Sequence, residues 1–136
     1  MIEPFRLNEP MILTGLDTVI LGNIDHLMTY CYKAEKIALP IDPNHPHTIC
    51  NGVALVPRGH GHVYHRWNGG MKYLSDMECL RAQDYSLLDN LFPGEILSYK
   101  CHVLKNGLRD ARIVYFHGKE KMHELPDVDW ITENWQ

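Results

Sequence analysis

The sequence predicts an α/β domain with a mixed central sheet and short flanking helices. Short apolar runs alternate along the chain with segments of helical periodicity, a pattern typical of this class. The 10 glycines and 8 prolines provide the turns that so many short elements require. With 136 residues, of which 45% are hydrophobic and 22% charged, we expect one ordinary globular domain over residues 1–136.

The N-terminal part of the chain predicts two strands and a helix. Residues 11–13 and 18–21 are short apolar runs, and Gly15 separates them. The apolar side chains of residues 24–36 recur at helical spacing on one face.

The middle of the chain predicts a strand, a loop, a second strand and a helix. Residues 37–39 form a brief apolar run, and residues 40–48, PIDPNHPHT, predict a loop because three prolines remove amide donors and disfavour helix. Residues 49–57 are mostly apolar, which is typical of a strand buried on both faces. Residues 59–68 are predicted to be helical.

The remaining elements follow from capping and turn signals. Ser75 and Glu78 form a capping-box pattern that predicts a helix as far as residue 82. The turns FPGE and KNGL each precede a predicted strand. The predicted segments are a helical turn at 85–91, strands at 96–104 and 112–116, a loop at 117–126 and a helical turn at 129–135.

Charge and hydropathy narrow the range of partners. The net charge of −4 gives no general attraction to nucleic acid or to anionic lipid. The N-terminal segment MIEPFRLNEP lacks the basic and apolar regions of a signal peptide, and no run approaches the roughly 18 apolar residues of a membrane span. We therefore expect a cytoplasmic protein without a membrane span, whose partners do not include nucleic acid.

Cysteine and histidine spacing gives only weak metal signals. Cys31, Cys50, Cys79 and Cys101 are irregularly spaced without a C-x-x-C pair, which predicts buried free thiols rather than a disulfide framework or a zinc knuckle. A further candidate is the segment GHGHVYH, but no cysteine or acidic residue accompanies its three histidines at ligand spacing. Those histidines are His60, His62 and His65.

Polar residues at predicted strand boundaries mark the candidate site. Asp17, Asn51 and His117 each stand at such a boundary, where open α/β sheets bind ligands. An unpaired carboxylate at the edge of a core strand is costly, so Asp17 needs a partner, either a turn amide or a ligand. A divalent cation such as Mn²⁺ accepts a carboxylate and an imidazole together, which makes Asp17 and His117 a candidate metal pair.

The segment HGKEK adds groups suited to phosphate. Gly118 allows close backbone approach, and Lys119 and Lys121 offer ammonium charges. The alternative is an exposed, charged loop with a solvated histidine.

Four segments in order, LDTVILGNID, NGVALV, SDMECL and ARIVYFHGKEK, resemble the C-terminal half of GT-A-type nucleotide-sugar glycosyltransferases. The resemblance covers roughly residues 11–135 and includes glycogenin-like members and related phage and bacterial ones. It implies transfer of a sugar from a nucleotide-diphosphate donor to a hydroxyl acceptor, with Mn²⁺ or Mg²⁺ as cofactor.

The resemblance also implies roles for individual residues. Asp17 takes the second acidic position of the metal-binding Asp-x-Asp motif, and Gly15 stands at the first. Asn51 and Gly52 match the strand that lines the donor-sugar pocket. Asp76 matches an acidic residue that contacts the donor sugar or the acceptor, and we expect it to be the catalytic residue.

The late motif of the family corresponds to the segment that begins at His117. The resemblance implies that His117 reaches the metal, while Gly118 and Lys121 meet the phosphates.

The family's N-terminal nucleotide-binding half has no counterpart in this sequence, which predicts a partial domain. We expect the sheet surface that this half would cover to be covered by a homo-oligomer contact or by a second chain. The alternative function is a non-catalytic remnant, or a binding or interaction module, derived from such an enzyme.

Overall fold

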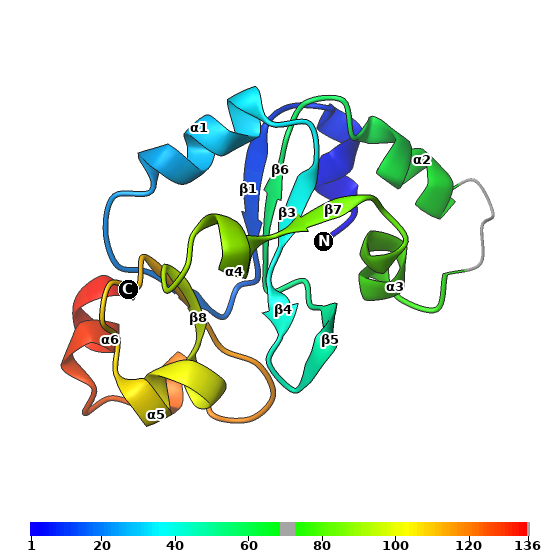
Figure 1. Cartoon of the computed structure of the whole chain (residues 1–136). Coiled ribbons are helices and arrows are strands. Elements are labelled where there is room, and N and C mark those ends of the chain that lie inside the picture. The colour runs from blue at the N-terminus through cyan, green and yellow to red at the C-terminus, as the bar shows by residue number, and fades with distance from the viewer. Residues whose placement is uncertain (69–72, 136) are drawn as a thin grey trace.

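The computed structural model describes residues 1–68 and 73–135 and confirms the predicted α/β class (Figure 1). Its strands form two mixed sheets and a separate hairpin instead of one central sheet. The first sheet has the order β1(Met11–Thr14), β6(Val53–Val56), β3(Ile37–Leu39), β7(Tyr85–Leu87), and the second β2(Thr18–Ile20), β9(Ile113–Tyr115), β8(Ile96–Ser98). The hairpin joins β4(Ile41–Asp42) and β5(His45–Ile49).

Both larger sheets are mixed because each has one parallel and one or more antiparallel pairings. In the first, β6 pairs antiparallel with β1 and β3, whereas β3 and β7 are parallel. In the second, β9 pairs antiparallel with β2 and parallel with β8. The chain passes from the first sheet to the second in the short connection between β1 and β2, which contains Gly15 and Asp17.

Short helices surround the sheets, as the sequence predicts. The α-helices are α1(Asp25–Lys33), α2(Gly61–Asn68), α3(Asp76–Arg81), α4(Leu88–Leu91), α5(Leu104–Asn106) and α6(Asp129–Asn134). Two 3₁₀ helices, η1(Glu3–Leu7) and η3(Met122–Glu124), and a π-helix, η2(Tyr99–Val103), complete the set. No helix among the described residues is long and apolar enough to cross a membrane.

Strand β6 is buried on both faces, as its apolar sequence predicts. Ala54 and Val56 belong to a core cluster with residues of η1, α2 and α3, whereas Val53 and Leu55 belong to one with α1. Because side chains alternate across a strand, α1 lies on one face of the first sheet and α2 and α3 lie on the other (Figure 1). A third cluster packs the second sheet against η2 and α6.

Some element predictions were right and others were wrong. The capping residue of α3 is Ser75, whose side chain accepts a hydrogen bond from the Glu78 amide at 3.2 Å. The predicted loop at 40–48 is a hairpin, since its prolines leave enough donors for a short, irregular pairing at an exposed edge. The predicted strand at 96–104 ends at Ser98, because the Ser98 hydroxyl accepts from the Cys101 amide at 3.2 Å and begins the π-helix.

The cysteines are free, as the spacing predicts. Cys31, Cys50 and Cys79 are buried, whereas Cys101 is only partly buried because it lies in the π-helix beside the candidate site.

Candidate functional site

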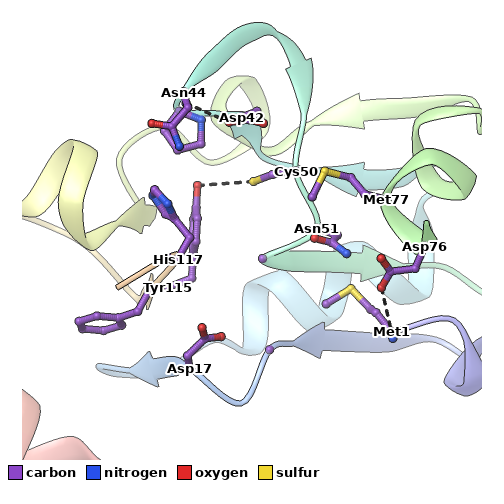
Figure 2. Close-up of a pocket in the computed structure, with 15 residues that line it drawn as sticks. Met1, Asp17, Asp42, Asn44, Cys50, Asn51, Asp76, Met77, Tyr115 and His117 are labelled. Carbon is purple, nitrogen blue, oxygen red and sulfur yellow. Dashed lines mark hydrogen bonds and ion pairs between the residues drawn. The ribbon is translucent and has the colours of Figure 1, made fainter. Parts of the chain in front are cut away.

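A cavity of about 520 Å³ lies where the two sheets and the hairpin meet (Figure 2). Its wall comes from the β1–β2 connection, the turn of the hairpin, the residues before β6, the start of α3 and the end of β9. The lining residues are Met1, Gly15, Asp17, Asp42, Pro43, Asn44, Cys50, Asn51, Gly52, Asp76, Met77, Tyr115, Phe116, His117 and Gly118. This volume is within the range of about 300–1,000 Å³ that small-molecule sites occupy.

The structure brings together the residues to which the resemblance gives a role, but not Lys119 or the three histidines of GHGHVYH. Asp17, Asn51, Gly52, Asp76, His117 and Gly118 line the cavity, and Lys121 donates a hydrogen bond to Asp17 without being a lining residue itself. Backbone hydrogen bonds explain the convergence. The Phe116 amide donates to the Asp17 carbonyl at 2.9 Å, and the Gly15 amide donates to the Gly52 carbonyl at 3.3 Å.

Among residues 1–68 and 73–135, the partner of the Asp17 carboxylate is the Lys121 ammonium and not a turn amide. Lys121 Nζ donates to Asp17 Oδ2 and, at 3.3 Å, to the Phe116 carbonyl. The Asp17 side chain is 39% exposed and that of Lys121 32%, so ligands can reach the pair. The carboxylate also folds over Gly15, where an added Cβ would lie 2.8 Å from Asp17 Oδ1. A side chain at position 15 would therefore displace it.

The floor of the cavity is built on Gly52. An added Cβ at this glycine would lie 2.7 Å from Cδ2 of Tyr115. Tyr115 is buried, with an exposed fraction of 3%. The Cys50 thiol donates to the Tyr115 hydroxyl at 3.8 Å, and burial raises the pKa of both groups. The floor is therefore neutral, and it depends on the absence of a side chain at position 52.

Asp42 was not singled out from the sequence, although it lines the cavity. Its carboxylate accepts from the Asn44 amide at 2.9 Å and the His45 amide at 3.3 Å, and it forms an ion pair with Arg81 at 3.4 Å. Burial acts to raise the pKa of Asp42, but these hydrogen bonds from Asn44 and His45 outweigh it and lower the pKa. Asp42 therefore holds the hairpin turn at the cavity edge; the Asp-Pro-Asn turn sequence was its only signal.

On the far side of the cavity, Asn51, Asp76 and Met77 lie opposite His117 and Tyr115 (Figure 2). Asp76 is the first residue of α3, and its carboxylate lies 3.5 Å from the Met1 amino group. The Asn51 amide forms no side-chain hydrogen bond within the described parts of the chain. Asn51 and Asp76 can therefore offer polar groups to a ligand.

His117 is held by residues of the second sheet and the π-helix. Its Nε2 lies 2.7 Å from the Ser98 hydroxyl oxygen and 3.9 Å from the Cys101 sulfur. Neither Ser98 nor Cys101 was singled out as a site residue, because the sequence predicted a continuous strand across both positions.

The imidazole of His117 favours the neutral state. Burial lowers its pKa, and the ammonium groups of Lys100 and Lys121 lower it further, against the opposing carboxylates of Asp42 and Asp17. Lys100 was also missed from the sequence; its Nζ is 3.9 Å from where a Cβ of Gly118 would lie. Gly118 itself has a φ of 70°, a conformation that favours glycine.

The donor set fits a divalent metal only together with ligand oxygens. Among residues 1–68 and 73–135, no three histidine, cysteine, aspartate or glutamate side chains converge to hold an ion. Mg²⁺ is commonly held by one or two carboxylates plus substrate phosphates, and Asp17 can supply such a carboxylate. His60, His62 and His65 therefore do not form a metal site within the described residues. His60 Nδ1 lies 2.9 Å from the Pro57 carbonyl oxygen, at hydrogen-bond distance.

No protein-family model matches the chain, and comparison with curated proteins gives no significant match. The functional argument therefore depends on the fold and on the geometry of the cavity.

Proposed function

We propose that the cavity binds the diphosphate and sugar of a nucleotide-diphosphate sugar and that the protein transfers this sugar to a hydroxyl acceptor, as the resemblance to GT-A glycosyltransferases implies. One observation carries the proposal: Asp17, Asn51, Asp76 and His117, from four separate segments, line a single cavity of about 520 Å³. Carboxylate, amide and imidazole groups facing one another are suited to a ligand that is both polyhydroxylated and anionic.

In this proposal, the cationic and the uncharged or acidic side chains of the cavity bind different parts of the nucleotide sugar, the diphosphate and the sugar. The diphosphate would lie toward His117 and Gly118, near the ammonium groups of Lys100 and Lys121. The sugar would lie toward Asn51 and Asp76, whose amide and carboxylate can hydrogen-bond hydroxyls. This arrangement would orient the anomeric carbon between the diphosphate and the acceptor.

Asp17 is the residue that we propose as a carboxylate ligand of Mn²⁺ or Mg²⁺. When bound, the cation would offset the negative charge that develops on the leaving diphosphate. Lys121 would then exchange the Asp17 carboxylate for a phosphate oxygen. His117 was also expected as a metal ligand, a role that depends on which of its ring nitrogens carries the proton.

The proposal predicts that Asp17→Asn removes the effect of the metal on donor binding and lowers the rate of sugar transfer. Calorimetry with Mn²⁺ and a panel of nucleotide-diphosphate sugars should identify one donor whose binding is tightened by the metal, and the substitution should remove that tightening. Transfer or donor hydrolysis should fall by about two orders of magnitude, because charge stabilisation by a metal is worth several kcal/mol.

The matched control is Asp84→Asn, since the Asp84 side chain is 78% exposed and, within the part of the chain that the structure describes, pairs with Lys36 alone. It should leave both donor binding and turnover unchanged. Metal-dependent binding that survives Asp17→Asn would refute the role of Asp17.

A binding module without transferase activity is the second candidate function. The ion pair between Asp17 and Lys121 favours it, because the ammonium already neutralises the carboxylate that a metal would need. Tight donor binding without transfer or hydrolysis in the same assays would identify this function.

A further inference from the structure

The Ser98 hydroxyl is buried and has few possible partners. Ser98 is the last residue of β8 and is 0% exposed. Its oxygen accepts a hydrogen bond from the Cys101 amide at 3.2 Å and lies 2.7 Å from His117 Nε2. Within residues 1–68 and 73–135, it makes no other side-chain hydrogen bond.

These two contacts determine where the hydroxyl hydrogen points. A backbone N–H can only donate, so the Ser98 oxygen must be the acceptor toward Cys101. If His117 Nε2 also donated to this oxygen, the hydroxyl hydrogen would have no acceptor among the described residues, and solvent cannot reach Ser98 because it is 0% exposed. Leaving a buried donor unsatisfied is costly, so the Ser98 hydroxyl donates to Nε2.

The direction of this hydrogen bond fixes the tautomer of the neutral imidazole. A Nε2 that accepts carries no proton, so the ring proton resides on Nδ1. Nδ1 forms no hydrogen bond within the described chain, and His117 lines the cavity. The Nδ1–H group is therefore the polar atom of this ring that remains for a ligand, and it is a donor rather than a lone pair.

The charges around His117 favour an anionic hydrogen-bond acceptor for its Nδ1–H group. The two nearby carboxylates are already paired, Asp17 with Lys121 and Asp42 with Arg81. Lys100, which acts on His117, takes part in none of the ion pairs formed among the described residues. An unpaired ammonium next to an N–H donor favours a phosphate oxygen at this point.

We propose that Ser98 is a positioning residue that fixes His117 in the Nδ1–H tautomer, so that His117 donates a hydrogen bond to a phosphate oxygen instead of coordinating a metal. The tautomer follows from the packing alone, whereas the assignment of the oxygen to a donor diphosphate rests on the proposed function. In this proposal, hydrogen bonding to a phosphate oxygen replaces the role of metal ligand that the resemblance implied for His117.

The test is the nitrogen spectrum of the His117 ring in the full chain. Long-range ¹H–¹⁵N correlation spectra, assigned with the variant His117→Gln, should show a protonated Nδ1 and an unprotonated Nε2 in the neutral state. Ser98→Ala should shift the population toward the Nε2–H tautomer, and Ser98→Thr, which keeps a hydroxyl, should retain the original one. A wild-type ring protonated on Nε2 would overturn the proposal even if Ser98→Ala does not fold.

A second arm uses inorganic pyrophosphate without metal, so it does not depend on sugar transfer. Pyrophosphate should shift the His117 Nδ1–H signal, and its affinity should fall about tenfold in folded Ser98→Ala, as expected for the loss of a hydrogen bond to a charged group. Ser98→Thr should restore the affinity. The predicted tautomer with no response to pyrophosphate would overturn the anion role, and absence of glycosyl transfer would refute only the proposed function.

Discussion

Replacing Gly52→Ala should lower the free energy of unfolding by about 1–3 kcal/mol, the usual cost of overpacking a well-packed core. The added Cβ would lie 2.7 Å from the buried Tyr115 ring, which must move because the glycine backbone cannot yield without disturbing β6. The displaced ring would also narrow the cavity, so donor binding should weaken together with stability. Denaturant unfolding and calorimetry on the same samples measure both effects.

Gly22→Ala is the matched control for this substitution. Its Cβ would also be close to another atom, 2.9 Å from Arg112 Nη1, but that atom is the end of a flexible side chain. The expected change is near zero or slightly stabilising, because alanine restricts the unfolded chain more than glycine does. Equal destabilisation by both substitutions would contradict the packing argument.

Replacing Lys121→Met should change metal binding and diphosphate binding in opposite directions. Mn²⁺ alone should bind more tightly, because the Asp17 carboxylate loses the ammonium that competes with the cation. A nucleoside diphosphate should bind about tenfold more weakly, since a hydrogen bond to a charged group is lost. Stability should change by less than about 1 kcal/mol, as is usual for a partly exposed ion pair.

Lys119→Met is the control in the same loop, because Lys119 is exposed and, unlike Lys121, forms no ion pair with Asp17. An equal loss of diphosphate affinity in both variants would show that only the general charge of the loop matters. Calorimetric titrations with Mn²⁺ alone and with the nucleoside diphosphate alone separate the two effects.

The fold class could be predicted because local patterns and tertiary structure agree over most of the chain. The apolar run of β6 and the Ser75 cap of α3 were both visible in the sequence and are both present. The division into two sheets could not be predicted, since it depends on long-range pairing of β9 with β2 and β8. The π-helix was missed because a single hydroxyl, that of Ser98, turns a segment that otherwise alternates as a strand.

Part of the candidate site could also be predicted from local sequence patterns. Asp17, Asn51 and His117 were found because polar residues at strand boundaries converge when the strands pair. Ser98 and Lys100 were missed because their approach to His117 depends on the π-helix. The pairing of Asp17 with Lys121 was not anticipated either, since residues 104 positions apart carry no local signal of contact.

The measurement that tests the donor site most directly is paramagnetic broadening by Mn²⁺ in the presence of the nucleotide-diphosphate sugar that binds best. Mn²⁺ broadens the amide signals of residues close to it, so the pattern locates the ion without relying on activity. The proposal predicts selective broadening at Gly15, Asp17 and Gly118, and its loss in Asp17→Asn. Broadening centred on His60, His62 and His65, or broadening at Asp17 that the nucleotide sugar leaves unchanged, would contradict it.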